Sequence, residues 1–275
     1  MYEMIYNINA VYFSPTGTTE KTVRKLAEDL SLCFGKTNKI NYINFTPRSM
    51  RTNAINFNFD DIVIFGIPVY AGRVPNVLLN YINSVKSNGA LAVAVVLYGN
   101  RNYDDALVEL KDILETNGFD VIAACAFIGE HSFSKTLAQN RPDEIDLNTA
   151  ESFAKQIFAR ILRETVHKSA AVPGNKPYRP YYKPKDENGD FVDIRKVTPR
   201  TSSSCIDCKI CADVCPMGSI DYENVSLLNG ICIKCGACIK RCPVNAKYYD
   251  DENYLRHKLE LEEEFASRKS PELFL

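Results

Sequence analysis

The sequence predicts a doubly wound α/β domain with a five-stranded parallel sheet in the order 2-1-3-4-5, followed by a small cysteine-rich α+β domain. Two observations predict this fold class. Over the first 170 residues, short apolar segments alternate with segments of helical period, which is the pattern of parallel strands joined by right-handed crossovers. Beyond residue 200, cysteines recur with one spacing in two copies, which indicates a separate and smaller unit.

Five segments have the composition of strands. Residues 7–13 and 40–45 are short runs rich in β-branched and aromatic side chains. Residues 61–69, 90–98 and 121–128 are almost continuously apolar, as expected for central parallel strands that are covered on both faces.

Helical segments separate these strands. Apolar residues at spacings i, i+3, i+4 and i+7 follow the first strand: Val23, Leu26, Ala27 and Leu30. The same period predicts helices over 74–85, 104–117 and 147–163. Because ligands of such sheets bind beyond the carboxyl ends of the strands, the loops after strands one, three and four are the candidate site.

Charge and hydropathy exclude two classes of partner. Lys plus Arg at 33 against Asp plus Glu at 34 leaves a net charge of −1, with no basic footprint for nucleic acid. The longest apolar run, residues 90–98, is far shorter than a membrane span. Residues 1–4 lack the basic start of an export signal, so we expect a cytoplasmic protein.

Composition divides the chain into four parts. Residues 1–170 form the first predicted domain, and residues 171–200 hold five prolines without periodicity, which indicates a connector. Its tyrosines argue against a purely flexible tether, so we expect it to lie along one or both domains. Residues 201–250 form the cysteine-rich domain, and residues 251–275 are expected to contain a C-terminal helix.

Eight cysteines form a repeat. The run Cys205-x-x-Cys208-x-x-Cys211-x-x-x-Cys215-Pro216 recurs 27 residues later as Cys232-x-x-Cys235-x-x-Cys238-x-x-x-Cys242-Pro243. This is the spacing of iron–sulfur proteins that hold two clusters. A disulfide framework would need an oxidising compartment, and zinc sites usually pair their ligands across a longer spacer, often with histidine. The repeat therefore favours iron–sulfur clusters over both alternatives.

Residues 201–250 resemble a bacterial dicluster ferredoxin. This resemblance implies two [4Fe-4S] clusters, with the fourth cysteine of each run ligating the other cluster. The ligands implied for cluster one are Cys205, Cys208, Cys211 and Cys242. Those implied for cluster two are Cys232, Cys235, Cys238 and Cys215.

The loop after the first strand is rich in hydroxyl groups and precedes a helix. Its candidate ligands are Ser14, Thr16, Gly17, Thr18 and Thr19. The free N–H groups and positive end of the following helix make this loop an anion cradle. The pattern Ser14-x-Thr16-Gly17-x-Thr19 resembles the phosphate loop of flavodoxins, which implies a flavodoxin-like fold and bound FMN. An ordinary helix N-cap with spare threonines is the alternative.

The loops after strands three and four occupy the places where flavodoxins hold the isoalloxazine ring. The residues that this resemblance assigns to the flavin are Pro68, Tyr70, Gly72, Gly99, Asn100, Arg101 and Tyr103. Gly99-x-x-x-Tyr103 is similar to the flavodoxin segment whose tyrosine stacks on the flavin, so Tyr103 is expected on one ring face and Tyr70 or its neighbours on the other. For either tyrosine alone, a surface aromatic packed on its own loop is the alternative.

Two features differ from flavodoxins. The sequence has no tryptophan to stack on the ring, and Arg73 and Arg101 lie in loops that tend to be acidic in small flavodoxins. A cation near the ring favours the anionic reduced flavin. We therefore expect the semiquinone–hydroquinone potential to be less negative than in flavodoxins. His131, in the loop after the fifth strand, is a candidate proton donor, with a purely structural histidine as the alternative.

Together the two resemblances cover nearly the whole chain, which is similar to flavodoxin–ferredoxin fusion proteins of anaerobic prokaryotes. They imply intracellular electron transfer between the clusters and FMN, with redox proteins as donor and acceptor, and a homodimer is compatible with them. The competing hypothesis is an FMN-dependent reductase of a small-molecule acceptor, fed through the ferredoxin domain. A third is a regulatory or structural protein whose flavin loop is empty.

Overall fold

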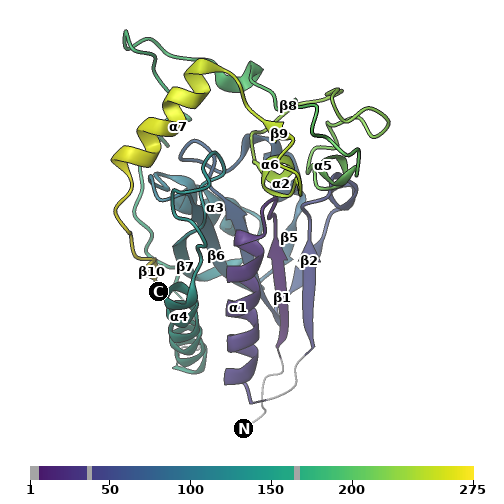
Figure 1. Ribbon diagram of the computed structural model, residues 1–275. Coiled ribbons are helices and arrows are strands. Elements are labelled where there is room, and N and C mark those ends of the chain that lie inside the picture. The colour runs from purple at the N-terminus through teal and green to yellow at the C-terminus, as the bar shows by residue number, and fades with distance from the viewer. Residues whose placement is uncertain (1–5, 36–38, 164–167) are drawn as a thin grey trace.

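The computed structural model describes residues 6–35, 39–163 and 168–275, which form an α/β domain and a smaller cysteine-rich lobe (Figure 1). The lobe lies over the carboxyl ends of the central strands, since residues from both parts line a common cavity there. Residues 1–4, on which the expectation of no export signal rests, lie outside the described residues.

Five parallel strands form the centre of the first domain. They are β1 (Asn7–Tyr12), β2 (Ile40–Asn44), β4 (Asp61–Pro68), β6 (Leu91–Tyr98) and β7 (Asp120–Ile128). Their spatial order is β2-β1-β4-β6-β7, which confirms the predicted order 2-1-3-4-5 of flavodoxin-like folds. Every residue of β6 is buried, as a central strand covered on both faces requires.

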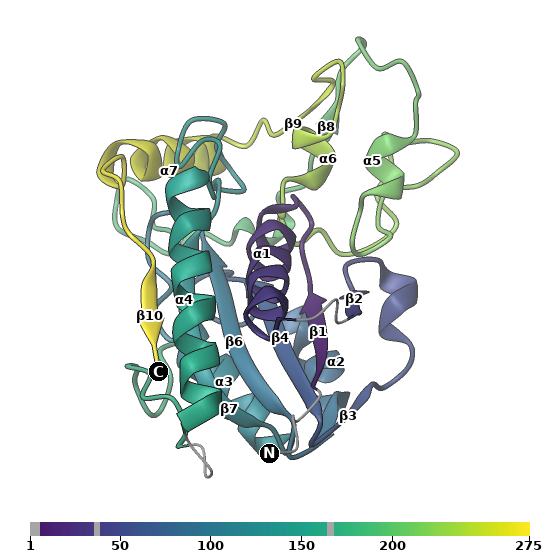
Figure 2. The ribbon, with the colours of Figure 1, turned by 90° about the horizontal axis from the view of Figure 1, so that it is seen from below.

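Helices cover both faces of this sheet. They are α1 (Thr18–Cys33), α4 (Glu144–Arg163), α2 (Leu79–Ser84) and α3 (Ala106–Thr116). The first two lie side by side on one face, where Leu26 and Phe153 share a core with the sheet (Figure 2). The other two cover the opposite face, where Ile82 and Leu107 belong to a second core. The alternation of strands and helices thus gives the predicted doubly wound domain.

One predicted helix is shorter than expected. Instead of a helix over 74–85, a 3₁₀ turn, η2 (Asn76–Leu78), follows Pro75 and leads into α2. Proline restricts the residue before it to extended conformations, so a helix cannot run through this point from Val74.

The chain after the lobe returns to the first domain. The helix α7 (Glu252–Glu264) begins at Asp251, whose carboxylate accepts a hydrogen bond from the N–H of Tyr254 (2.9 Å). Then β10 (Glu272–Phe274) pairs antiparallel with β7 and becomes a sixth strand of the sheet. The sequence does not predict β10, because three residues are too few to show alternation.

The lobe repeats its backbone with the 27-residue period of its sequence. The short helices α5 (Ile210–Asp213) and α6 (Ala237–Lys240) are equivalent, and each follows a left-handed residue, Lys209 (φ 63°) or Gly236 (φ 75°). The two ends of the lobe meet where β8 (Arg200–Thr201) pairs antiparallel with β9 (Lys247–Tyr248).

The connector, residues 171–200, runs across the loops of the first domain. The N–H of Tyr182 donates to the carbonyl of Ala71 (2.9 Å), and the hydroxyl of Tyr181 donates to the carbonyl of Val74 (2.7 Å). These hydrogen bonds place the connector beside the loop that follows β4.

Short elements complete the fold. They are the paired strands β3 (Asn56–Asn58) and β5 (Lys86–Asn88) and the 3₁₀ turns η1 (Arg48–Arg51) and η3 (Ile194–Lys196). In the part of the chain that the structure describes, no helix combines the length and apolarity needed to cross a lipid bilayer.

Candidate functional site

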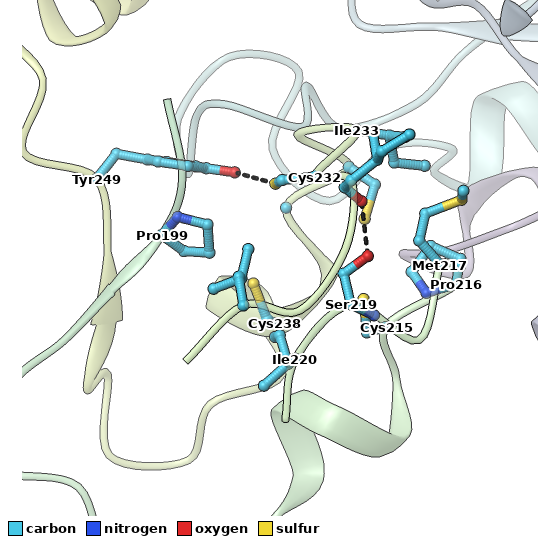
Figure 3. Close-up of a pocket in the computed structure, with 14 residues that line it drawn as sticks. Pro199, Cys215, Pro216, Met217, Ser219, Ile220, Cys232, Ile233, Cys238 and Tyr249 are labelled. Atoms are coloured by element: carbon cyan, nitrogen blue, oxygen red, sulfur yellow. Dashed lines mark hydrogen bonds between the residues drawn. The ribbon is translucent and has the colours of Figure 1, made fainter. Parts of the chain in front are cut away.

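Two cavities in the lobe are each lined by four cysteines. The outer cavity is lined by Cys205, Cys208, Cys211 and Cys242. The inner cavity is lined by Cys215, Cys232, Cys235 and Cys238 (Figure 3). Each set takes three cysteines from one run and the last from the other, which is the grouping that the resemblance implies for the two clusters. The spaces are similar, 310 and 350 Å³, so size does not distinguish them.

The chemistry of these cavities fits iron–sulfur clusters. All ten cysteines lie in the described residues and are free thiols, which does not agree with a disulfide framework. A zinc site would need four ligands at about 2 Å from one ion. Among the described residues, no three His, Cys, Asp or Glu side chains converge in that way. The cysteines instead surround spaces whose other walls are largely apolar, such as Ile210 and Val225 in the outer cavity and Ile220 in the inner one.

Backbone donors point at the last cysteine of each run. The N–H of Ser219 lies 3.3 Å from the sulfur of Cys215, and the N–H of Ala246 lies 3.1 Å from the sulfur of Cys242. Both donors come four residues after their cysteine, so the repeat extends to these contacts. Hydrogen bonds to a thiolate stabilise its charge, and they are one of the means by which proteins tune cluster potentials.

The two cavities differ in their surroundings. Cys208 is exposed, so the outer cavity approaches the surface. Burial raises the pKa of the Cys235 thiol to about 12 and also raises the pKa of Cys238. Figure 3 shows the hydroxyl of Tyr249 pointing at the sulfur of Cys232, at 3.8 Å. The inner cavity is therefore the more shielded of the two.

A third cavity, here named the loop cavity, lies between the lobe and the carboxyl ends of the strands. Its wall includes residues of all three predicted loops and one residue of the lobe: Thr16, Thr18, Thr19, Pro68, Tyr70, Gly99 and Cys235. Cys235 also lines the inner cavity. One cysteine side chain therefore borders both sites.

Unpaired donors line the loop cavity where it meets the start of α1. The hydroxyls of Thr16, Thr18 and Thr19 form no hydrogen bond with any other described residue, although Thr19 is only 1% exposed. The N–H groups at the start of α1 have no acceptor within the helix. Gly17 adopts a φ of 89°, which closes the turn. This set of hydroxyl and amide donors fits a phosphate group.

Ser14 has a different position from its predicted neighbours. Its hydroxyl accepts a hydrogen bond from the N–H of Glu20 (2.9 Å) in the first turn of α1, and it does not line the loop cavity. Ser14 thus satisfies one N–H of the first turn although the N-cap of α1 is Gly17, whereas the threonines after Ser14 line the cavity.

A tight turn positions Tyr70. Ala71 (φ 52°) and Gly72 (φ 77°) are both left-handed, and Tyr70 and Arg73 exchange backbone hydrogen bonds of 3.1 Å. Burial raises the pKa of the Tyr70 hydroxyl, which lines the loop cavity. Gly72 does not line it, and a methyl group built on Gly72 would lie 2.3 Å from the carboxylate of Asp104.

Two residues expected at the flavin ring lie elsewhere. Tyr103 is 7% exposed, packs on Tyr98 with ring centres 5.5 Å apart, and donates its hydroxyl to Glu272 of β10 (2.8 Å). The side-chain amide of Asn100 donates to two carbonyl groups between α7 and β10 (2.6 and 2.9 Å). Both side chains hold the C-terminal segment, and neither residue lines the loop cavity. The stacking of Tyr103 on a flavin stays a prediction.

The two loop arginines have separate environments. Arg73 forms a two-pronged ion pair with Glu109 (2.7 Å for both contacts) and lies over the ring of Tyr178 at 4.8 Å. It anchors the connector and lines neither cavity beside the lobe. Arg101 lies 4.6 Å from the ring centre of Tyr182 and borders the side cavity described next. Of these two arginines only Arg101 borders a cavity beside the lobe, and its guanidinium pairs with Asp104.

The side cavity adjoins the loop cavity and shares part of its wall. It is lined by Val69, Tyr70, Ala71, Arg101, His131, Ser132, Tyr182, Lys234 and His257, among others. His131 borders both cavities, and its Nδ1 accepts a hydrogen bond from the N–H of Phe133 (3.1 Å). Burial lowers the pKa of His131 to about 3, so near pH 7 the imidazole is neutral and carries its proton on Nε2. It can donate a hydrogen bond but is not a cationic acid.

Lys240 joins the lobe to the first domain. Its ammonium donates to the carboxylate of Glu130 and to the carbonyls of His131 and Ser134 (2.8 Å each). These three acceptors satisfy all three N–H groups of the ammonium. Its side chain is only 13% exposed, so the ion pair with Glu130 is shielded from water.

Gly236 brings the two parts into close approach. A methyl group built on it would lie 2.3 Å from the carbonyl oxygen of Ser132. Sequence analysis did not identify Gly236 or Lys240, although a signal was present. One repeat length earlier, their positions hold Lys209 and Asp213, so the two repeats differ where one of them contacts the first domain.

Tyr182 was also missed. It lines the side cavity and stacks on His257 with ring centres 5.7 Å apart. The tyrosines of the connector indicated that this segment is packed, but nothing in the sequence indicates which cavity it covers.

Parts of this chain are similar to known proteins. A family model for the 4Fe-4S dicluster domain matches residues 204–246. A search of curated proteins found no match. Solved structures that are similar include a flavodoxin from the domain Archaea, at 12% identity and a TM-score of 0.39, covering 57% of this chain and 99% of that one. A flavodoxin from Streptococcus pneumonia TIGR4 has 19% identity and a TM-score of 0.40, with 55% and 97% covered.

Proposed function

We propose that this chain, a flavodoxin-like domain joined to a 4Fe-4S dicluster domain, transfers electrons between two [4Fe-4S] clusters and FMN. The observation that carries the proposal is the position of Cys235, which lines both the inner cavity and the loop cavity. A ligand of cluster two would then border the flavin site directly. No other part of the chain would need to lie between the two groups.

Different side chains would bind the phosphate and the ring of FMN. Thr16, Thr18 and Thr19, with the start of α1, would hold the phosphate through hydroxyl and N–H donors. Tyr70 and Gly99 would border the ring. His131 would offer a neutral N–H donor at the same wall.

The outer cavity is more exposed than the inner one, and this difference indicates the order of the sites along the electron-transfer path. Cys208 and Ile206, which is 62% exposed, bring the outer cavity to the surface. A redox protein could therefore exchange electrons with cluster one, while cluster two borders the flavin. Clusters carry one electron at a time, whereas bound FMN can take or give one or two. The order of the sites thus suits a converter between one-electron and two-electron partners.

Anaerobic purification tests this function. Iron, sulfide and FMN would be quantified beside the visible spectrum. We expect about eight irons and about one FMN per chain, because two four-iron clusters and one flavin are proposed. A chain that holds the iron but takes up no flavin, even after FMN is added, would contradict the flavin half of the proposal.

The side cavity favours a second candidate function. Its space of 690 Å³ continues from the loop cavity, and Arg101, Lys234 and His257 provide polar groups in its wall. An FMN-dependent reductase would bind a small acceptor there. Turnover with a panel of quinones and nitro compounds would support this alternative, whereas a carrier reacts only with proteins.

A further inference from the structure

An arginine of the lobe lies beside the loop that joins β1 to α1. A methyl group built on Gly17 would lie 3.3 Å from Nη2 of Arg241. Gly17 belongs to the loop between β1 and α1, whereas Arg241 follows α6 and precedes Cys242. The guanidinium therefore reaches from the lobe to the first domain.

The charge of Arg241 is not neutralised by a neighbour. The guanidinium of Arg241 forms no ion pair or hydrogen bond with another described residue, although its backbone N–H donates to the carbonyl of Ala237 (2.9 Å). Nearby cations are engaged: Lys21 donates to the carbonyl of Pro142 (2.8 Å), and Lys240 pairs with Glu130, the carboxylate in the wall of the loop cavity. Arg241 is thus the cation beside the loop that is left available for an anion.

The cluster motif does not account for this arginine. The position one repeat length before Arg241 is Val214, which also precedes the last cysteine of its run. A cation there is therefore not needed to form the lobe. The second repeat contacts the first domain through Gly236 and Lys240, whereas the first repeat contacts it through Pro216, whose carbonyl accepts a hydrogen bond from Arg51.

The loop itself supplies no cation. Its donors are the unpaired hydroxyls of Thr16, Thr18 and the 99%-buried Thr19, and the N–H groups at the start of α1. A flavin phosphate carries up to two negative charges, and a guanidinium can bind phosphate through two parallel hydrogen bonds.

We propose that Arg241 is a phosphate ligand of the flavin site, supplied by the cluster lobe to a loop of the other domain. The inference rests on the proposed function, because it concerns the FMN of that site. Its consequence is that the phosphate is recognised fully only when the lobe is docked. FMN should therefore be favoured over riboflavin by more than the loop alone provides.

Flavin affinity tests this inference without relying on electron transfer. Cluster-loaded chain, freed of flavin, would be titrated with FMN and with riboflavin under anaerobic conditions, with quenching of flavin fluorescence as the readout. In Arg241→Gln we expect the Kd for FMN to rise about tenfold, since one charge-assisted hydrogen-bonding partner is lost, and the Kd for riboflavin to stay unchanged. Arg241→Lys should retain part of the preference, because it keeps the charge without the two-pronged geometry.

Arg200→Gln is the matched control, because Arg200 is an exposed lobe arginine whose guanidinium pairs with Asp250. It should leave both affinities unchanged, and the cluster absorbance should be equal in all variants. Equal FMN affinity in Arg241→Gln and wild type would overturn the inference but leave the proposed function standing. A rise for FMN and riboflavin alike would also overturn it, since the loss would not concern the phosphate. If the wild-type chain binds neither flavin, the proposed function itself fails.

Discussion

The two halves of the cysteine repeat have similar backbone conformations, but one of their cavities reaches the surface and the other borders the first domain. Left-handed residues recur 27 positions apart, as in Lys209 and Gly236, and each half donates an N–H to the last cysteine sulfur of its run. The outer cavity reaches the surface at Cys208, whereas Cys235 of the inner cavity borders the first domain. Two clusters held by the same cysteine spacing can therefore have different roles in electron transfer.

The differences between the halves are concentrated at contacts with other groups. Gly236 and Lys240 contact the first domain, and their equivalents in the first repeat are Lys209 and Asp213. Conversely, the buried Lys247 lines the outer cavity, while its equivalent, Ile220, lines the inner one. The repeat thus preserves the cysteines, but it changes the residues that contact the first domain and one residue that lines each cavity.

The largest expected effect comes from removing the exchanged cysteines. Cys215→Ala should abolish the inner cluster and about half of the bound iron, because Cys215 lines the inner cavity despite its place in the first run. Cys242→Ala should instead abolish the outer cluster. Iron analysis and electron paramagnetic resonance of the reduced protein would count the clusters that remain.

Double variants show which cluster each cysteine serves. Cys215→Ala combined with Cys235→Ala should lose no more iron than either single change, because both residues line one cavity. Cys215→Ala combined with Cys208→Ala should lose both clusters. The reverse pattern would mean that each run binds its own cluster without exchange.

A smaller effect is expected from crowding the contact between the lobe and the first domain. Gly236→Ala places a methyl group 2.3 Å from the Ser132 carbonyl, and such overpacking costs roughly 1–3 kcal/mol. We expect a tenfold or greater fall in the docked population and slower reduction of the flavin through the lobe, measured by stopped-flow mixing with dithionite. Lys209→Ala, at the equivalent left-handed position, is the control. Equal flavin reduction in both variants would show that Gly236 does not set the docking.

Removing the buried cation Lys247 should lower the reduction potential of the outer cluster. Lys247 is 3% exposed, and its ammonium donates to the hydroxyl of Thr201 (2.8 Å) and to a backbone carbonyl. Lys247→Met should lower the potential of the outer cluster by roughly 100 mV, since a nearby charge at an effective dielectric of about 20 is worth a few kcal/mol. Redox titration measures this shift. Lys176→Met, on the exposed connector, should cause none, and a shift of equal size there would indicate a non-specific effect of charge.

The smallest expected effect concerns one hydroxyl group. Tyr249→Phe removes the donor 3.8 Å from the sulfur of Cys232 and should lower the potential of the inner cluster by roughly 20–40 mV, because such a bond is worth about 0.5–1 kcal/mol. Tyr222, one repeat length earlier, is 55% exposed, so Tyr222→Phe should leave both clusters unchanged. If the reduction potential of the inner cluster is unchanged in Tyr249→Phe, the contact between Tyr249 and Cys232 does not contribute to the difference between the two clusters.

The central fold could be predicted because its signals are local. The apolar run 90–98 differs from β6 by a single residue at its start, and the fully buried strand explains the run. In contrast, β10 forms because it pairs with β7. The helix α2 is short because a 3₁₀ turn follows Pro75. Neither dependence produces a periodic pattern in the sequence.

The candidate site was predictable only in part, for a similar reason. The cysteines of each cavity follow from a short spacing that recurs in the sequence. The direction of Tyr103 depends on Glu272, 169 positions away, and that of Arg73 depends on Glu109 and the connector. Loop side chains take their direction from such distant partners, so their sequence position alone does not determine which cavity they line.

The last strand of the sheet changes how the lobe should move. Because β10 returns to β7 after α7, the lobe is attached to the first domain through the connector at one end and through the C-terminal segment at the other. A domain on one flexible tether must diffuse before each contact, and its effective concentration falls as the tether lengthens. A lobe attached at both ends needs no such search. The rate of transfer within the molecule should therefore be insensitive to solvent viscosity, and only encounters with outside partners should slow in glycerol.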